Sequence, residues 1–146
     1  MKRLHFSTAI NAPRHAVWKV LWDDLSFRDW TSAFAEGSHA ISDWHEGSPI
    51  QFLAPGGTGM SAVIETKRPN ELMSFRHIAE IKDGKEQPPA EWSGALETYR
   101  LEERDGSTTL SVELDAADEY REMFETTFPK ALARVKTLAE SAVTSL

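Results

Sequence analysis

The last stretch of the chain, residues 118–146, constrains the fold more than any other. Its apolar side chains recur every three or four residues, which is the spacing of one face of an α-helix, and charged side chains occupy the other faces. A helix of this length extends for about 40 Å at ~1.5 Å per residue, so it needs a broad apolar surface to cover. The apolar stripe consists of Tyr120, Phe124, Phe128, Ala131, Val135, Leu138 and Ala142.

Polar residues predict where this helix begins, and a proline predicts a distortion within it. Asp115 and Asp118 stand at the positions of an N-cap and of a favourable charge at the positive end of the helix dipole. Pro129 lacks the backbone donor that an internal helical residue supplies. We therefore expect the helix to kink near residues 125–128 or to split there.

Strand patterns dominate the chain before this helix. An alternation of polar and apolar residues predicts a first strand over residues 3–10, and two short amphipathic helices follow it, over residues 13–22 and 26–34. Six further strands are expected at residues 38–44, 49–53, 60–67, 72–81, 92–102 and 108–114. Short turns, such as the strong hairpin signal Asp105-Gly106, join consecutive strands. This order predicts an antiparallel meander that curves around the terminal helix.

Two of these strands differ in how clearly their inward faces can be assigned. In the fourth strand, an alternation of Met60, Ala62 and Ile64 competes with one of Ser61, Val63 and Glu65. Both remain open, and none of these six residues is taken as a site candidate. The fifth strand is clearer, and its inward face is expected to carry Met73, Phe75, His77, Ala79 and Ile81.

The composition narrows the class of protein. A chain of 146 residues has the size of one domain and can bury a core, so we expect a single domain over residues 1–146. No apolar run reaches membrane length and no secretory leader precedes the first strand, which favours a cytoplasmic protein. The absence of cysteine excludes disulfides, thiolate metal sites and a cysteine nucleophile. The net charge of −7 disfavours nucleic acids and anionic membranes as partners.

Three segments carry a resemblance to a known superfamily. They are FSTAINAP at residues 6–13, followed by Val17-Trp18; WHEGSP at residues 44–49; and ETYRL at residues 97–101, which leads through Asp105-Gly106 into TLSV at residues 109–112. In these segments the chain resembles the START-like, or SRPBCC, superfamily, and within it the homologues of the heat-shock ATPase activator. The second segment is similar to the aromatic-x-x-Gly turn of that group.

The resemblance implies both a fold and a cavity. The fold is the α+β helix-grip fold, with a curved antiparallel sheet of six to seven strands around a long C-terminal helix and two short helices after the first strand. The cavity would lie between the sheet and that helix. Members of the superfamily include ligand carriers, cyclases, hormone receptors and chaperone partners, so the resemblance is specific for the fold rather than for one function.

The aromatic residues are compatible with such a cavity. Five Trp, seven Phe and two Tyr fall mostly on predicted inward or helix-facing positions. Aromatic side chains at these spacings are equally typical of a filled core, so a ligand cavity and a solid core both remain open. The candidate ligand-binding residues are Trp30, Phe34, Phe52, Phe75, His77, Trp92, Glu97, Tyr99, Phe124 and Phe128.

Three polar residues stand out among these candidates. The fifth and sixth strands are expected to pair, which places His77, Glu97 and Tyr99 on one concave surface. A buried carboxylate is costly unless it is paired, so Glu97 is a candidate functional group. The alternative we favour is that it pairs with an arginine, such as Arg76 or Arg100, or lies near the open end of the cavity. The polar loop at residues 82–90 and Trp92 would lie at the rim of the cavity.

No motif identifies a reaction, a metal or a cofactor. His39 and His45 lack a metal-ligand spacing, and the glycine-rich turn at residues 56–59 lacks the Lys-Ser/Thr ending of a phosphate loop. We therefore assign no catalytic residue, no metal ligand and no cofactor.

Three functions are compatible with the sequence. The first is the binding of a hydrophobic or aromatic small molecule in the cavity. The second is a protein-interaction module related to heat-shock ATPase activators, as a monomer or a homodimer. The third is an enzyme, such as a cyclase or aromatase, that would use His77 and Glu97 as acid and base and would need them close together.

Overall fold

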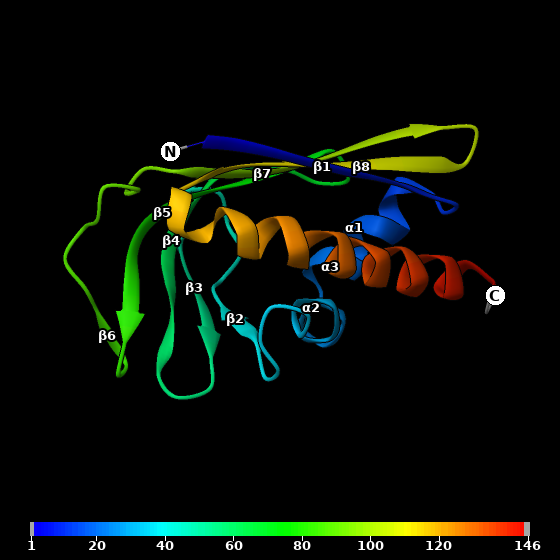
Figure 1. Cartoon of the computed structure of the whole chain (residues 1–146). Coiled ribbons are helices and arrows are strands. Elements are labelled where there is room, and N and C mark those ends of the chain that lie inside the picture. The colour runs from blue at the N-terminus through cyan, green and yellow to red at the C-terminus, as the bar shows by residue number, and fades with distance from the viewer. Residues whose placement is uncertain (1, 145–146) are drawn as a thin grey trace.

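The computed structural model describes residues 2–144 and confirms the predicted α+β helix-grip fold. A curved antiparallel sheet bends around the long C-terminal helix α3 (Asp118–Thr144), and two short helices, α1 (Arg14–Trp22) and α2 (Asp24–Thr31), follow the first strand (Figure 1). The strands are β1 (Lys2–Ile10), β2 (His39–Ile41), β3 (Pro49–Ala54), β4 (Thr58–Arg68), β5 (Leu72–Lys82), β6 (Lys85–Glu86), β7 (Leu96–Arg104) and β8 (Ser107–Ala116).

The sheet is a meander whose first strand pairs with its last. The strand order is β1-β8-β7-β5-β4-β3-β2, with β6 paired to β5, and every pairing is antiparallel. The two-residue strand β6 adds to the expected seven and lies in the segment that we expected to be a loop. Among residues 2–144, no helix is both long enough and apolar enough to span a membrane.

Two predicted strands are shorter in the structure. The segment predicted at residues 38–44 contributes only β2, and Trp44 at its end has a positive φ of 64°. The strand predicted from Trp92 begins instead at Leu96, so Trp92 lies in the turn that precedes β7. Gly94 within this turn has a φ of 93°, a left-handed conformation that interrupts an extended strand.

Helix α3 is continuous through Pro129, so the alternative that the helix splits there is wrong, and the kink near residues 125–128 stays a prediction. Pro129 is exposed. The carbonyl that it leaves without a helical donor therefore lies on the solvent side, where water can satisfy it. Asp115 is not the N-cap either, because it lies in β8, where Nε of Arg3 donates to its carboxylate at 3.0 Å.

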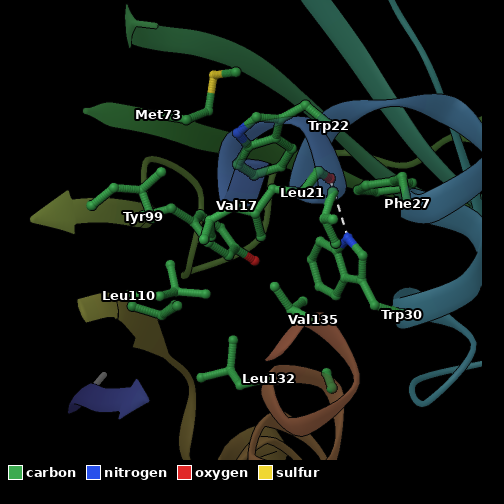
Figure 2. Close-up of a cluster of buried hydrophobic side chains, with 14 of the residues drawn as sticks. Val17, Leu21, Trp22, Phe27, Trp30, Met73, Tyr99, Leu110, Leu132 and Val135 are labelled. Carbon is green, nitrogen blue, oxygen red and sulfur yellow. Dashed lines mark hydrogen bonds between the residues drawn. The ribbon is translucent and has the colours of Figure 1, made fainter. Parts of the chain in front are cut away.

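The buried face of α3 is rotated slightly from the predicted stripe. Ala142 is exposed, whereas Leu132 and Ala139, which the stripe omitted, are buried. Figure 2 shows how this face meets the rest of the core. Leu132 and Val135 of α3 lie opposite side chains of α1, α2 and the sheet, and Nε1 of Trp30 on α2 donates to the carbonyl of Leu21 on α1 at 3.1 Å.

A β-bulge in β5 changes which of its residues face the helix. Ala62 pairs with His77 but Ser61 pairs with Ala79, so Ile78 is an extra residue in the ladder. Beyond the bulge, Glu80 pairs with Met60 on the concave side. The prediction for Ala79 and Ile81 is therefore wrong, because both are buried but lie outside the main core cluster. The open question in β4 is resolved in favour of Met60, Ala62 and Ile64, since the last two are buried in that cluster.

Candidate functional site

A cavity of about 320 Å³ lies between the concave face of the sheet and the first half of α3. Strands β3, β4, β5 and β7 form one wall, and α2 with the segment after it forms another. Eleven aromatic side chains border the cavity. Their rings pack mostly edge to face, as between Phe52 and Phe75, whose centroids are 5.1 Å apart at 88°.

All ten candidate residues from the sequence border this cavity. Trp30 comes from α2 and Phe34 from the turn after it; Phe52 comes from β3; Phe75 and His77 come from β5; Trp92 precedes β7; Glu97 and Tyr99 come from β7; and Phe124 and Phe128 come from α3. The structure therefore brings the whole set together around one space. Their role in binding a ligand stays a prediction.

Three polar side chains form a hydrogen-bonded cluster on the β5–β7 wall, which we call the polar triad: His77, Glu97 and Tyr99. Nε2 of His77 donates to Oε1 of Glu97 at 2.9 Å, and the hydroxyl of Tyr99 donates to Oε2 of Glu97 at 2.5 Å. The expected arginine partner is wrong, because Arg76 binds Glu65 at 2.9 Å instead. Residues on one face of adjacent strands meet directly, so the local pairing of β5 with β7 accounts for the triad.

The triad also has a defined protonation pattern. Burial acts to raise the pKa of Glu97, but the hydrogen bond and charge of His77 and the hydrogen bond from Tyr99 outweigh it, so that pKa is lowered. Burial and the neighbouring Glu97 carboxylate raise the pKa of Tyr99 well above its ordinary value. At neutral pH Glu97 is thus a carboxylate and Tyr99 a neutral phenol that donates to it.

The distance within the triad bears on the enzymatic hypothesis. The side chains of His77 and Glu97 are 2.9 Å apart, which meets the proximity that acid–base catalysis requires. Both oxygens of Glu97, however, already accept hydrogen bonds from His77 and Tyr99. Nδ1 of His77 is buried and has no hydrogen-bond partner among the residues that the structure describes. The geometry therefore supports a structural and orienting role as well as a chemical one.

The comparison with protein-family models decides the family. The model described as Activator of Hsp90 ATPase homolog 1-like protein matches residues 11–140. The chain belongs to this AHSA1-like family. Its resemblance to the START-like superfamily is thereby confirmed. No curated protein matches the sequence significantly.

Solved structures agree with this assignment at the level of the fold. Protein MLL2253 from Mesorhizobium loti has a TM-score of 0.77 at 14% identity, over 96% of this chain and 98% of that chain. The Aha1 dimer from Colwellia psychrerythraea has a TM-score of 0.75 at 18% identity, over 96% of this chain and 97% of that one. DynU16, a protein in the dynemicin biosynthetic locus, has a TM-score of 0.71 at 13% identity, over 97% of this chain and 48% of that one.

Several residues that border the cavity of this AHSA1-like protein were missed in the sequence. Trp22 has ring centroids 5.0 Å from Tyr99 and 5.4 Å from Phe75, and its spacing of four from Trp18 on one helix could have marked it. The alternation of residues in β5 could not have placed Glu80 in the cavity, because the bulge before it reverses which residues face inward. The others of note are Phe27, Met60, Tyr120 and Met123.

No metal site accompanies the cavity in the part of the chain that the structure describes. Within residues 2–144, no group of three or more His, Asp and Glu side chains is arranged to hold a metal ion. The lining combines aromatic rings with the polar triad and the carboxylate of Glu80.

Acid should destabilise this protein partly through Glu97. Its folded pKa lies below the ordinary value of 4.5, so its contribution to stability is present above that value and is lost as the pH falls through the folded pKa. We expect Glu97→Gln to lose less unfolding free energy than the wild type between about pH 5 and pH 3. Urea melts at several pH values measure this.

Glu102→Gln provides the control for the acid experiment. Glu102 is exposed on the same strand, β7, so its removal changes the net charge equally without touching the triad. This variant should keep the pH dependence of the wild type. Equal pH slopes for the wild type and Glu97→Gln would contradict the assigned pKa of Glu97.

Proposed function

We propose that this AHSA1-like protein binds a hydrophobic, largely aromatic small molecule in the cavity between the sheet and α3. The observation that carries the proposal is a void of about 320 Å³ bordered by eleven aromatic side chains. Pockets that bind small molecules have volumes of roughly 300–1,000 Å³ and combine apolar walls with a few polar groups. A flat apolar ligand fits this space, and its burial among the rings would supply most of the binding free energy.

The polar triad would orient the ligand. The side chains of His77 and Glu97 are 12% and 18% exposed, so a polar ligand atom can approach them while the rest of the ligand is buried. Because the two hydrogen bonds within the triad are already formed, it holds its geometry before the ligand arrives. A ligand with one or two polar atoms on an apolar body matches this arrangement.

Filling the cavity should abolish this binding. Ala54, at the end of β3, is half-buried and borders the cavity, so Ala54→Phe should occupy the space that the ligand needs. We expect the neutral probe N-phenyl-1-naphthylamine to bind this variant at least about tenfold more weakly than the wild type, which corresponds to ~1.4 kcal/mol. The quenching of tryptophan fluorescence reports binding, since Trp22, Trp30 and Trp92 border the cavity.

The matched control makes the same chemical change elsewhere. Ala133 is exposed on α3 and does not border the cavity, so Ala133→Phe should bind the probe like the wild type. Native mass spectrometry of the purified protein tests for a retained ligand in the same samples. Failure of the wild type to bind any neutral aromatic probe, or unchanged binding by Ala54→Phe, would reject the proposal.

The second candidate function is a protein-interaction module that acts on a chaperone. The description of the matching family, activators of the Hsp90 ATPase, favours it. Leu25 on α2 and Ile41 on β2 are large apolar side chains that are exposed and available for contact. The ATPase rate of a purified Hsp90 chaperone, with and without the protein, distinguishes this function from ligand binding alone.

A further inference from the structure

The charged residues that border the cavity are all acidic. The lining contains Glu80, Glu97 and Asp115, and no Lys or Arg occurs among the lining residues that the structure describes. The carboxylate of Asp115 accepts hydrogen bonds from Nε of Arg3 at 3.0 Å and from the backbone N–H of Leu96 at 3.3 Å. Both oxygens of Glu97 are bonded within the triad. Glu80 is therefore the carboxylate best able to meet a ligand.

Glu80 reaches the cavity because of the bulge in β5. The extra residue Ile78 shifts the alternation, so Glu80 pairs with Met60 and the side chains of both border the cavity. Bulges often re-aim a side chain next to a binding site. The side chain of Glu80 is 34% exposed, which places it where the cavity meets solvent.

The partner of Glu80 is a weak competitor for a ligand. Nζ of Lys82 lies 3.2 Å from Oε1 of Glu80, but the Lys82 side chain is 62% exposed. An exposed ion pair of this kind contributes only about 0–1 kcal/mol, and the lysine can move into water when a better-buried cation arrives. Lys82 itself does not border the cavity.

The pKa of Tyr120, at the start of α3, depends on the charges of Glu80 and Lys82. Burial raises the pKa of its phenol, the negative charges of Glu80 and then Glu119 raise it further, and Lys82 only partly opposes them. The field at this end of the cavity is therefore negative on balance. The ring of Tyr120 borders the same cavity as Glu80, and a carboxylate together with an aromatic face forms a favourable site for an organic cation.

We infer that the cavity selects a hydrophobic amine, whose ammonium group lies at Glu80 and Tyr120 while its apolar body lies among the aromatic rings. The inference rests on the proposed ligand-binding function and specifies the class of ligand. A carboxylate on the same apolar body would lose its water without gaining a lysine or an arginine. The basic side chains in the lining are His39 and His77, and Nε2 of His77 is already bonded to Glu97.

Three ligands with one apolar body test this selectivity: 1-naphthylmethylamine, 1-naphthalenemethanol and 1-naphthoate. At pH 7 the first is a cation, the second is neutral and the third is an anion. Isothermal titration calorimetry of the full chain at low salt measures each Kd. We expect the amine to bind about tenfold more tightly than the naphthoate, with the alcohol between them.

A variant that removes the charge of Glu80 tests where the ammonium group of the ligand lies. Glu80→Gln keeps the size of the side chain but removes its charge, so it should reduce the preference for the amine over the alcohol to within about twofold. Glu102→Gln is the matched control, because it removes one negative charge from an exposed position on β7 that does not border the cavity. This control should keep the preference of the wild type.

The outcomes separate this inference from the function on which it rests. If none of the three ligands binds, the proposed ligand-binding function is rejected and the inference with it. If the alcohol binds but the naphthoate binds as tightly as the amine, the selectivity is overturned while ligand binding stands. An amine preference that survives in Glu80→Gln would overturn the assignment of the ammonium to Glu80.

Discussion

Phe128→Ala should lower the free energy of unfolding by about 3–5 kcal/mol, and Phe124→Ala by clearly less, about 1–2 kcal/mol. Both residues border the cavity from α3, one helical turn apart. The difference follows from what lies on the other sides of each ring. Phe128 is 2% exposed, and its ring centroid lies 5.0 Å from that of Phe6 and 4.9 Å from that of Phe34. Removal of its ring would open a hole between two aromatic neighbours.

Truncation of Phe124 should cost less unfolding free energy. It is half-buried and borders the cavity, and its ring centroid lies 5.9 Å from that of Phe128, so part of its surface already faces open space. Urea denaturation of both variants measures the contrast, with Thr126→Ala, an exposed position between them, as the control for helix effects. Equal losses of 3–5 kcal/mol at both positions would mean that this end of the cavity is packed solid.

Glu97→Leu should also cost about 3–5 kcal/mol, because it removes the acceptor that two largely buried donors share. The imidazole of His77 and the hydroxyl of Tyr99 would both lose their acceptor. A buried donor without an acceptor costs about 1–3 kcal/mol on its own. Glu97→Gln should cost less, since the amide oxygen can still accept one of the two hydrogen bonds.

The double variant Glu97→Leu/His77→Phe provides the decisive comparison. With both His77 and Glu97 replaced by apolar side chains, only the Tyr99 hydroxyl remains without its partner, so stability should partly recover relative to Glu97→Leu. Chemical denaturation of the two single variants and the double variant forms a double-mutant cycle. Additive losses in that cycle would show that His77 and Glu97 do not interact in the way that the 2.9 Å contact indicates.

Local patterns in the sequence were sufficient to predict the fold. The spacing of three and four residues in α3 and the alternation in β1, β7 and β8 report which face of each element is buried, and this depends only on the geometry of the backbone. The Asp105-Gly106 turn likewise joins β7 to β8, with positive φ values of 52° and 81° at its two residues. The order of the elements then restricts the topology to a meander that wraps one helix.

The same alternation predicted the candidate site wherever the pairing of the strands is regular. The pairing of β5 with β7 is regular, so the alternation of side chains along each strand correctly placed His77 and Glu97 on the cavity side. Their direct contact was not foreseen, and an arginine was expected for Glu97. The distance between side chains of adjacent strands depends on register and twist, which arise when the sheet assembles.

Tertiary structure alone decided the features that give the cavity its character. The bulge at Ile78 reversed the alternation of β5 and turned Glu80 inward, because one extra residue in a ladder exchanges the faces of all that follow. Pro129 left α3 continuous since it lies on the exposed side of the helix. Sequence could identify aromatic residues that face inward, but whether they fill the interior or leave about 320 Å³ empty depends on how far α3 lies from the sheet, and that distance is set by packing of the whole chain.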